Sequence, residues 1–221
     1  MRIEKLLILS FLLTSSVALA GIVTYTSSSA FEAALAGAPN QVEDYATFSA
    51  GTLIAAGSTL NGITYTSFNL VGSSTQDGII SNQFNSFSGL SLGANENNGA
   101  AQFFFDSDSF NISFASTYAI GVFFNVNQNS GTFGIVSPVG NASTGSASYD
   151  TGTFVFAGLI STTPFTSAQI FSDSGGNGTA SYNIPEIILA QAVPEPAAFT
   201  MIALGTAFIA ALLLIQRRRV T

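Results

Sequence analysis

Histidine, cysteine and tryptophan are all absent from the 221 residues of the chain. Zinc sites built from histidine or cysteine, cysteine nucleophiles, and every catalytic triad or dyad that uses imidazole are therefore excluded. The absence of cysteine also excludes a disulfide scaffold, although an exported protein is free to form one. These absences predict a protein that is not an enzyme.

Basic residues are few, and all five lie near the two ends of the chain: Arg2, Lys5, Arg217, Arg218 and Arg219. The segment 21–193 holds ten of the twelve acidic residues and no lysine or arginine, so its formal charge is about −10. Phosphate binding draws its affinity from lysine and arginine, which excludes nucleic acid and anionic lipid head groups as partners of this segment. Cations and neutral glycans remain admissible partners.

The first twenty residues have the three parts of a secretory signal peptide. Two basic residues precede an apolar block at 6–13, and the small residues Ala18 and Ala20 stand before Gly21. Signal peptidase requires small residues at these positions, so cleavage is predicted after Ala20. A buried N-terminal helix is the alternative, but it explains only the apolar block. Residues 1–20 are therefore predicted to direct export, with signal peptidase as a partner.

The other end of the chain has the features of a single membrane-spanning helix. The uncharged run 197–215 has 19 residues, close to the roughly 20 that cross a bilayer core. Pro194 and Pro196 disfavour helix in the residues before them, so the helix is predicted to begin after them. The arginines at 217–219 stay cytoplasmic, which places everything before Val193 outside. A buried core helix is the alternative, and the arginine cluster argues against it.

This C-terminal region resembles the tail of the PEP-CTERM family of bacterial surface proteins. The match consists of the motif Pro194-Glu195-Pro196, the apolar run 197–215 and the basic cluster Arg217, Arg218 and Arg219. The resemblance implies that residues 194–221 form a sorting tail that an exosortase, a membrane enzyme, processes near the motif. It also implies a Gram-negative host that makes exopolysaccharide. The expected location is an inner-membrane-anchored precursor, followed by the cell surface or the extracellular matrix of a biofilm.

Between the two ends, residues 21–193 are predicted to form one all-β domain. At 173 residues the segment is long enough to bury a core without disulfides. Short apolar runs alternate with turn residues, and Ile120, Val122, Phe124 and Val126 share one face of a strand because side chains alternate with period two. Many short strands predict a two-sheet β-sandwich or a barrel. The expected strands are 42–48, 63–68, 101–105, 110–114, 119–126, 132–137, 153–159, 167–171 and 179–189.

One helix is predicted near the start of this domain. Ser29 and Glu32 have capping-box spacing, and Gly37 is placed to end the helix. The stretch 28–52 looks like the opening of the jelly-roll domains that are often joined to PEP-CTERM tails, which implies a jelly-roll-like sandwich. The last strand before the motif departs from that group, because it reads Ile184-Pro185-Glu186-Ile187.

The ten carboxylates of this segment have no basic partner, so calcium is a candidate bound ion. Calcium takes its ligands from carboxylate, carbonyl and water oxygens. Jelly rolls commonly bring the first and last strands together, so Glu43, Asp44 and Glu186 are the predicted calcium ligands. Asp106-Ser107-Asp108 and the segment 173–177 are further acidic groups, neither of which has EF-hand spacing. Solvated turn carboxylates are the alternative for all three groups.

Three functions are consistent with the sequence. The main prediction is an exported, exosortase-sorted surface or matrix protein with a structural or adhesive role linked to exopolysaccharide. A glycan-binding module is the alternative, and a carboxylate-based glycoside hydrolase, which needs only two acids at a fixed separation, is the third. Six tyrosines are candidates for stacking on sugar rings, with half-buried core positions as the alternative: Tyr25, Tyr45, Tyr65, Tyr118, Tyr149 and Tyr182.

Overall fold

The computed structural model describes residues 21–38, 40–82, 89–95, 102–126, 129–175 and 181–191. The predicted signal peptide and the predicted sorting tail, with its motif, apolar run and arginines, lie outside these residues. Among the described helices there is none long and apolar enough to span a membrane.

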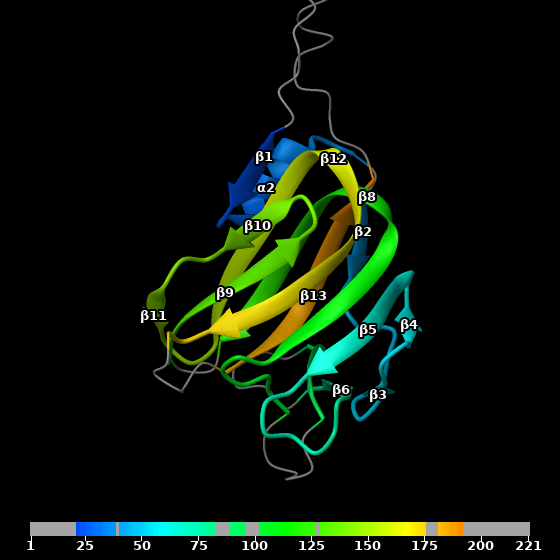
Figure 1. Cartoon of the computed structure of the whole chain (residues 1–221), viewed down its shortest axis with the longest axis vertical. Coiled ribbons are helices and arrows are strands. Elements are labelled where there is room, and N and C mark those ends of the chain that lie inside the picture. Colours follow the sequence, from blue (N-terminus) through cyan, green and yellow to red (C-terminus); the bar gives the residue numbers. More distant parts are fainter. Residues whose placement is uncertain are drawn as a thin grey trace, which may run out of the picture.

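The described residues form one helix and thirteen β-strands (Figure 1). The helix is α2 (Ser28–Leu35). In chain order the strands are β1 (Ile22–Tyr25), β2 (Asn40–Glu43), β3 (Leu53–Ile54), β4 (Thr59–Leu60), β5 (Ile63–Asn69), β6 (Gly78–Ser81), β7 (Ser91–Ala94), β8 (Ser109–Val126), β9 (Asn129–Ser137), β10 (Gly140–Ser143), β11 (Ala147–Tyr149), β12 (Thr153–Asp173) and β13 (Tyr182–Ala190).

The prediction of an all-β domain is confirmed, but the strands form one hydrogen-bonded antiparallel sheet in place of two separate ones. Its main path runs β10-β9-β12-β8-β13-β7-β6-β3, and β1, β2, β4, β5 and β11 pair with strands of that path or with each other. The sheet is continuous because β8 and β12 are long enough to pass from one layer of the domain into the other. A jelly-roll connectivity stays a prediction.

Strands β8 and β12 change neighbours midway along their length. The first part of β8 pairs with β5 and with the second part of β12, whereas residues 119–126 pair with β13 and with the first part of β12. The register between β8 and β12 shifts between Ile160 and Phe165, where Pro164 supplies no amide donor. Figure 1 shows both strands curving over at one end of the molecule. We call the layer of β4, β5, β9 and β10 the first layer, and that of β1, β2, β7 and β13 the second layer.

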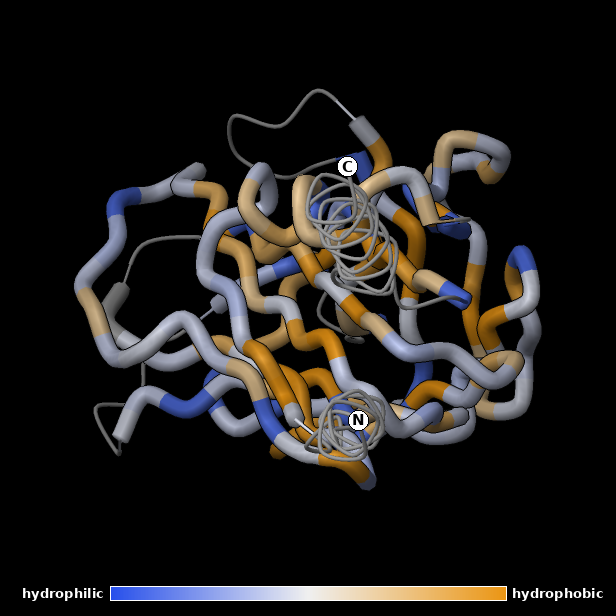
Figure 2. Tube along the Cα trace, turned by 90° about the horizontal axis from the view of Figure 1, so that it is seen from above, coloured by the Kyte–Doolittle hydropathy of each residue, from blue (hydrophilic) through white to orange (hydrophobic). Residues whose placement is uncertain are grey.

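Aromatic side chains fill the space between the two layers. Phe133 of β9 in the first layer contacts Tyr182 of β13 in the second, with ring centroids 5.5 Å apart, and Phe124 of β8 at 5.6 Å. The alternation predicted for β8 is confirmed, because Ile120, Val122, Phe124 and Val126 all belong to this core. Figure 2 shows hydrophobic stretches gathered inside the outline of the domain and hydrophilic stretches on peripheral loops.

Helix α2 covers part of the outer face of the second layer. Its N-cap is Ser27, whose side chain accepts a hydrogen bond from the Ala30 amide at 3.4 Å, so the predicted cap at Ser29 is wrong. The C-cap Ala36 is left-handed and Gly37 follows with a φ of 81°, as the predicted glycine stop requires. Phe31 and Leu35 are buried against the sheet in a second, smaller core.

Two glycines on neighbouring strands form the seat of this helix. Gly121 of β8 and Gly158 of β12 are paired in register, and a methyl group added at either would lie 2.9 Å or less from the rings of Phe31 and Phe156. The absence of side chains there lets Phe31 of α2 approach the backbone of the sheet.

Two pairs of residues in which glycine follows Asn or Asp have different backbones. Asn61 and Gly62 have positive φ angles and form the tight turn of the hairpin between β4 and β5. Gly78, which follows Asp77, lies in strand β6 instead, where a methyl group added to it would lie 2.8 Å from the side chains of Leu92 and Phe68.

The chain enters and leaves the domain at the same end. Ile22 at the start of β1 pairs with Ser161, the adjacent Ile160 pairs with Ala119, and Ala119 pairs with Ala190 at the end of β13. The two predicted tails therefore attach at the same end of the domain, with β12 and β8 between their attachment points.

Candidate functional site

The predicted neighbours β2 and β13 do pair, which brings the three predicted calcium ligands into one region. Glu43 lies opposite Ile187, an inner-core residue, and is fully buried. Asp44 and Glu186 both line a hollow on the outer face. The pleat thus separates Glu43 from Asp44 and Glu186, because successive side chains of a strand point to opposite faces. Among the described residues no group of three or more potential metal ligands occurs, and calcium binding stays a prediction.

Glu43 is a buried carboxyl group at the end of β2. Its Oε1 accepts a hydrogen bond from the Tyr45 amide at 2.8 Å, and its Oε2 has no partner among the described residues. Burial raises the pKa of Glu43, while the hydrogen bonds from the Tyr45 amide and the Asn61 side chain oppose that rise. The surroundings therefore favour the protonated form more than water does.

Tyr45 and Tyr65 lie beside Glu43 and join their hydroxyl groups at 2.9 Å. Both are fully buried, and burial raises the pKa of each phenol. Together with the fully buried Tyr182, they occupy the core and cannot stack on a ligand. Of the six candidate tyrosines, only Tyr25, Tyr118 and Tyr149 are partly exposed.

A β-bulge in β13 places Glu186 on the outer face. Asn183 pairs with Asn125 and Glu186 pairs with Phe123, so two residues of β13, including Pro185, oppose a single residue of β8. Proline suits a bulge because it has no amide to donate, and bulges re-aim the side chains that follow them. Glu186 is thereby set next to Phe123 in the middle of the outer face.

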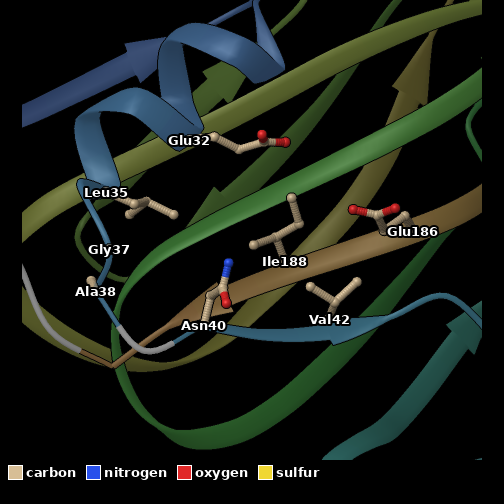
Figure 3. A pocket seen from close by; sticks show the side chains of 8 residues that line it. All are labelled: Glu32, Leu35, Gly37, Ala38, Asn40, Val42, Glu186 and Ile188. Carbon is tan, nitrogen blue, oxygen red and sulfur yellow. The ribbon is translucent and has the colours of Figure 1, made fainter.

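Three neighbouring hollows lie along this face beside α2, and together we call them the outer groove. The first, of about 510 Å³, lies among Glu32, Val42, Glu186 and Ile188, as Figure 3 shows. Glu186 also borders the second hollow, of about 390 Å³, which continues past Asp44, Leu90, Phe123 and Phe154. Phe123 and Phe154 are shared with the third, of about 530 Å³, which reaches Tyr149 and the start of α2.

The outer groove is acidic at one end and aromatic at the other. Phe154 is 46% exposed and lies beside partly buried Phe123. Burial raises the pKa of Glu186, and the nearby carboxylates of Glu32 and Asp44 raise it further. No lysine, arginine or histidine lies between residues 21 and 193, so none of the described residues brings a basic side chain to this part of the groove.

Two buried asparagines lie on the same face. Asn125 of β8 pairs in register with Phe154 on one side and with Asn183 of β13 on the other. They are 2% and 0% exposed, and the Oδ1 atom of each has no hydrogen-bond partner among the described residues. Asn183 donates from Nδ2 to the Ser91 hydroxyl. Either orientation of an asparagine amide leaves polar groups to satisfy, and neither residue lines one of the three hollows described above.

The other two acidic groups hold loops together. Asp108 accepts hydrogen bonds from the Val71 amide at 2.6 Å and from the Phe105 amide at 2.7 Å. Asp106 accepts one from the Ser174 amide, and Asp173 accepts one from the Gly175 amide, both at 2.7 Å. The described carboxylates of these groups thus stabilise turns. The alternative of a solvated carboxylate is wrong for Asp108, which is 0% exposed.

Sequence reasoning missed Glu32, Phe123 and Phe154 as groove residues. A signal for Phe123 was present, because the alternation in β8 that assigns Phe124 to the core also assigns Phe123 to the opposite face. The bulge also had a signal in Pro185, a proline within a run that otherwise reads as a central strand.

No protein-family model matches the chain, and no curated protein matches it. Among solved structures, the xylan-binding domain CBM22-1 of Xyn10C from Paenibacillus barcinonensis is similar at 13% sequence identity with a TM-score of 0.32. The match covers 66% of this chain and 99% of that chain. A TM-score this low does not establish a shared fold.

Proposed function

We propose that the domain is a non-catalytic carbohydrate-binding module of an exported surface protein, and that the outer groove is its binding site. The observation that carries the proposal is the combination of exposed Phe154 and partly buried Phe123 with the carboxyl groups of Asp44 and Glu186 around one hollow. Ligand sites in proteins commonly join apolar walls to a few polar groups in this way.

A sugar is able to bind both the aromatic side chains and the carboxyl groups of this hollow. The C–H face of a sugar ring packs on an aromatic ring, and Phe154 presents nearly half of its surface to solvent. Sugar hydroxyl groups donate hydrogen bonds, and a carboxylate accepts them more strongly than a neutral oxygen does. Glu186 and Asp44 border the same hollow as Phe154, so one bound sugar is able to contact both kinds of group.

The charge of the domain narrows the ligand class. Polyanions such as nucleic acid and sulfated or uronic-acid glycans are repelled by ten acidic residues that have no basic residue among them. Neutral and cationic polysaccharides remain.

The test is binding of the full-length protein, in a detergent without a sugar head group, to a panel of neutral, anionic and amino-sugar polysaccharides. Saturable binding to at least one polysaccharide, weakened about tenfold by Phe154→Ala, is expected because aromatic anchors carry much of the energy at such sites. Val136→Ala is the matched control, since Val136 is an exposed apolar residue on β9 in the other layer. Binding that is insensitive to Phe154→Ala, or no binding at all, overturns the proposal.

A carboxylate-based hydrolase is distinguished in the same samples. Glu186 and Asp44 are the acids that a glycosidase in this groove would use. We expect no release of reducing ends during prolonged incubation with any bound polysaccharide. Release that stops with Glu186→Gln would make the protein an enzyme.

We further propose that the chain is an exosortase substrate with an adhesive role linked to exopolysaccharide. The proposal is supported by the sequence of the tail and by the attachment of both predicted tails at one end of the domain, which leaves the other end directed away from the membrane. A membrane-spanning helix needs only apolar length and flanking charge, so it does not require the motif Pro194-Glu195-Pro196. The motif therefore indicates recognition by another protein, for which we propose the exosortase.

Replacement of the three motif residues by alanine should leave membrane insertion intact and stop maturation. Replacement of Arg217, Arg218 and Arg219 should weaken retention and orientation instead. The measurement is the mass of surface-exposed protein from cells that make the sorting enzyme. A wild-type C-terminus that is intact through Thr221 would reduce the tail to an anchor.

A further inference from the structure

The outer groove concentrates negative charge at its acidic end. Glu32 and Glu186 border the first hollow, and Glu186 and Asp44 border the second, so three carboxyl groups lie along one path. Glu32 and Asp44 are exposed, whereas Glu186 is only partly so. Fixed charges of one sign along a concave surface focus the field and attract ligands of the opposite sign.

Glu186 borders both hollows and so lies between the other two carboxyl groups of this path. Burial raises its pKa, and the carboxylates of Glu32 and Asp44 raise it further, which means that both neighbours are close enough to disfavour a third negative charge. A ligand that brings a positive charge to Glu186 relieves this repulsion, whereas a neutral ligand that displaces water from the groove intensifies it.

The aromatic end supplies a surface for the rings of the same ligand. Phe154 is 46% exposed and borders the same hollow as Glu186 and Asp44. A sugar ring that packs on Phe154 therefore lies beside these carboxyl groups.

From these contacts we propose that the ligand of the outer groove is a cationic amino-sugar polymer, a hexosamine chain in which part of the amino groups are free. Its ammonium groups pair with Glu186, Glu32 and Asp44, and its ring faces pack on Phe154 and Phe123. This inference rests on the proposed glycan binding and adds the class of sugar. Charge complementarity selects this ligand over a neutral glucan, which offers the carboxylates hydroxyl groups but no counter-charge.

The experiment compares glucosamine oligomers with N-acetylated oligomers of equal length and with a neutral glucan, using full-length protein at about pH 7 in low and high salt. Free amines should improve affinity about tenfold or more over the N-acetylated oligomers at low salt, which corresponds to about 1.4 kcal/mol. This advantage should shrink in high salt, because exposed charges are screened.

Glu186→Gln keeps the size of the side chain and removes its charge, so it should reduce binding of the glucosamine oligomers several-fold more than it reduces binding of the N-acetylated oligomers, which lose only a stronger hydrogen-bond acceptor. Asp77→Asn is the matched control, because it removes the same charge from the residue before β6 and outside the groove. Equal effects of the two substitutions would mean general attraction between polyelectrolytes and would overturn the assignment to this groove.

The remaining outcomes separate the inference from the proposed function. Equal, salt-independent binding of acetylated and free-amine oligomers that is lost with Phe154→Ala overturns the amino-sugar class and keeps glycan binding. The absence of binding to every oligomer overturns both. Polylysine serves as a cation without sugar rings, and binding of polylysine as tight as that of the glucosamine oligomers would show that the groove selects charge alone.

Discussion

Gly121 lies beneath helix α2, and addition of one methyl group there is expected to destabilise the domain. In Gly121→Ala the new Cβ would lie 2.7 Å from Cζ of Phe156 and 2.9 Å from Cε1 of Phe31. Neither ring is free to move away, because Phe31 is 0% and Phe156 4% exposed and the two rings contact each other at 5.3 Å. Phe156 is further held by Phe123 at 5.0 Å.

Two opposing terms decide the size of the effect. Overpacking of a closed core costs about 1–3 kcal/mol. Replacement of glycine by alanine in extended backbone returns about 0.4–1 kcal/mol, because the unfolded chain loses freedom. The net expectation is a loss of about 1–2 kcal/mol, which for a domain of this size lowers Tm by about 2–8 °C.

Thermal and urea unfolding followed by circular dichroism measure this loss, with Ser116→Ala at an exposed position of the same strand as the control. A double-mutant cycle with Phe156→Leu identifies the cause. The smaller side chain should offset part of the Gly121→Ala cost, with a coupling of at least about 0.5 kcal/mol. An unchanged Tm for Gly121→Ala, or additive effects in the cycle, would refute the packing of α2 on these glycines.

Four further outcomes are expected. Tm should rise as the pH is lowered from about 8 to about 5, because Glu43 and Glu186 have raised pKa values in the folded state. The stability that these two groups contribute is complete below the ordinary glutamate pKa of about 4.3 and is lost as the pH rises through their folded pKa values. A Tm that falls on acidification contradicts this prediction. Tyr45→Phe should cost about 1–3 kcal/mol in urea unfolding by leaving the Tyr65 hydroxyl buried without its partner, and Tyr45→Phe with Tyr65→Phe should cost less than the sum of the single changes. If Glu43, Asp44 and Glu186 bind calcium, the ion should raise Tm through mass action, and an unchanged Tm in chelator removes that site. N-terminal sequencing of the exported protein should begin at Gly21, and a retained Met1 would disprove the signal peptide.

The residue pattern of β8 shows how much of a strand can be predicted from local sequence. Alternating apolar residues predicted a strand with one buried face, and the structure buries all four of them: Ile120, Val122, Phe124 and Val126. The same reasoning predicted two strands, 110–114 and 119–126, where the structure has β8, and two strands, 153–159 and 167–171, where it has β12. The residues between the two runs of each pair lack a regular alternation of apolar side chains. Each pair of runs is one strand, since the backbone continues its hydrogen bonds with a new neighbour on the far side of the register shift.

The predicted calcium ligands show what local sequence cannot predict. Adjacent acidic residues at 43 and 44 look like a pair, yet their side chains lie on opposite faces because successive side chains alternate. Only the pairing of Glu43 with the core residue Ile187 shows that Glu43 takes the buried face. The neighbours that Glu186 acquires, Phe123 across the bulge and Glu32 on the helix, come from segments more than sixty residues away.

Composition alone determined the chemistry that this protein has available. The domain is acidic and has no histidine, cysteine or internal basic residue, and these are counts that no folding can alter. The tertiary structure decided which of its acids are buried, which cap turns and which line the outer groove. Burial, pKa and proximity depend on strand register and on a single bulge, and a shift of one residue in either would move every later side chain to the other face of the sheet.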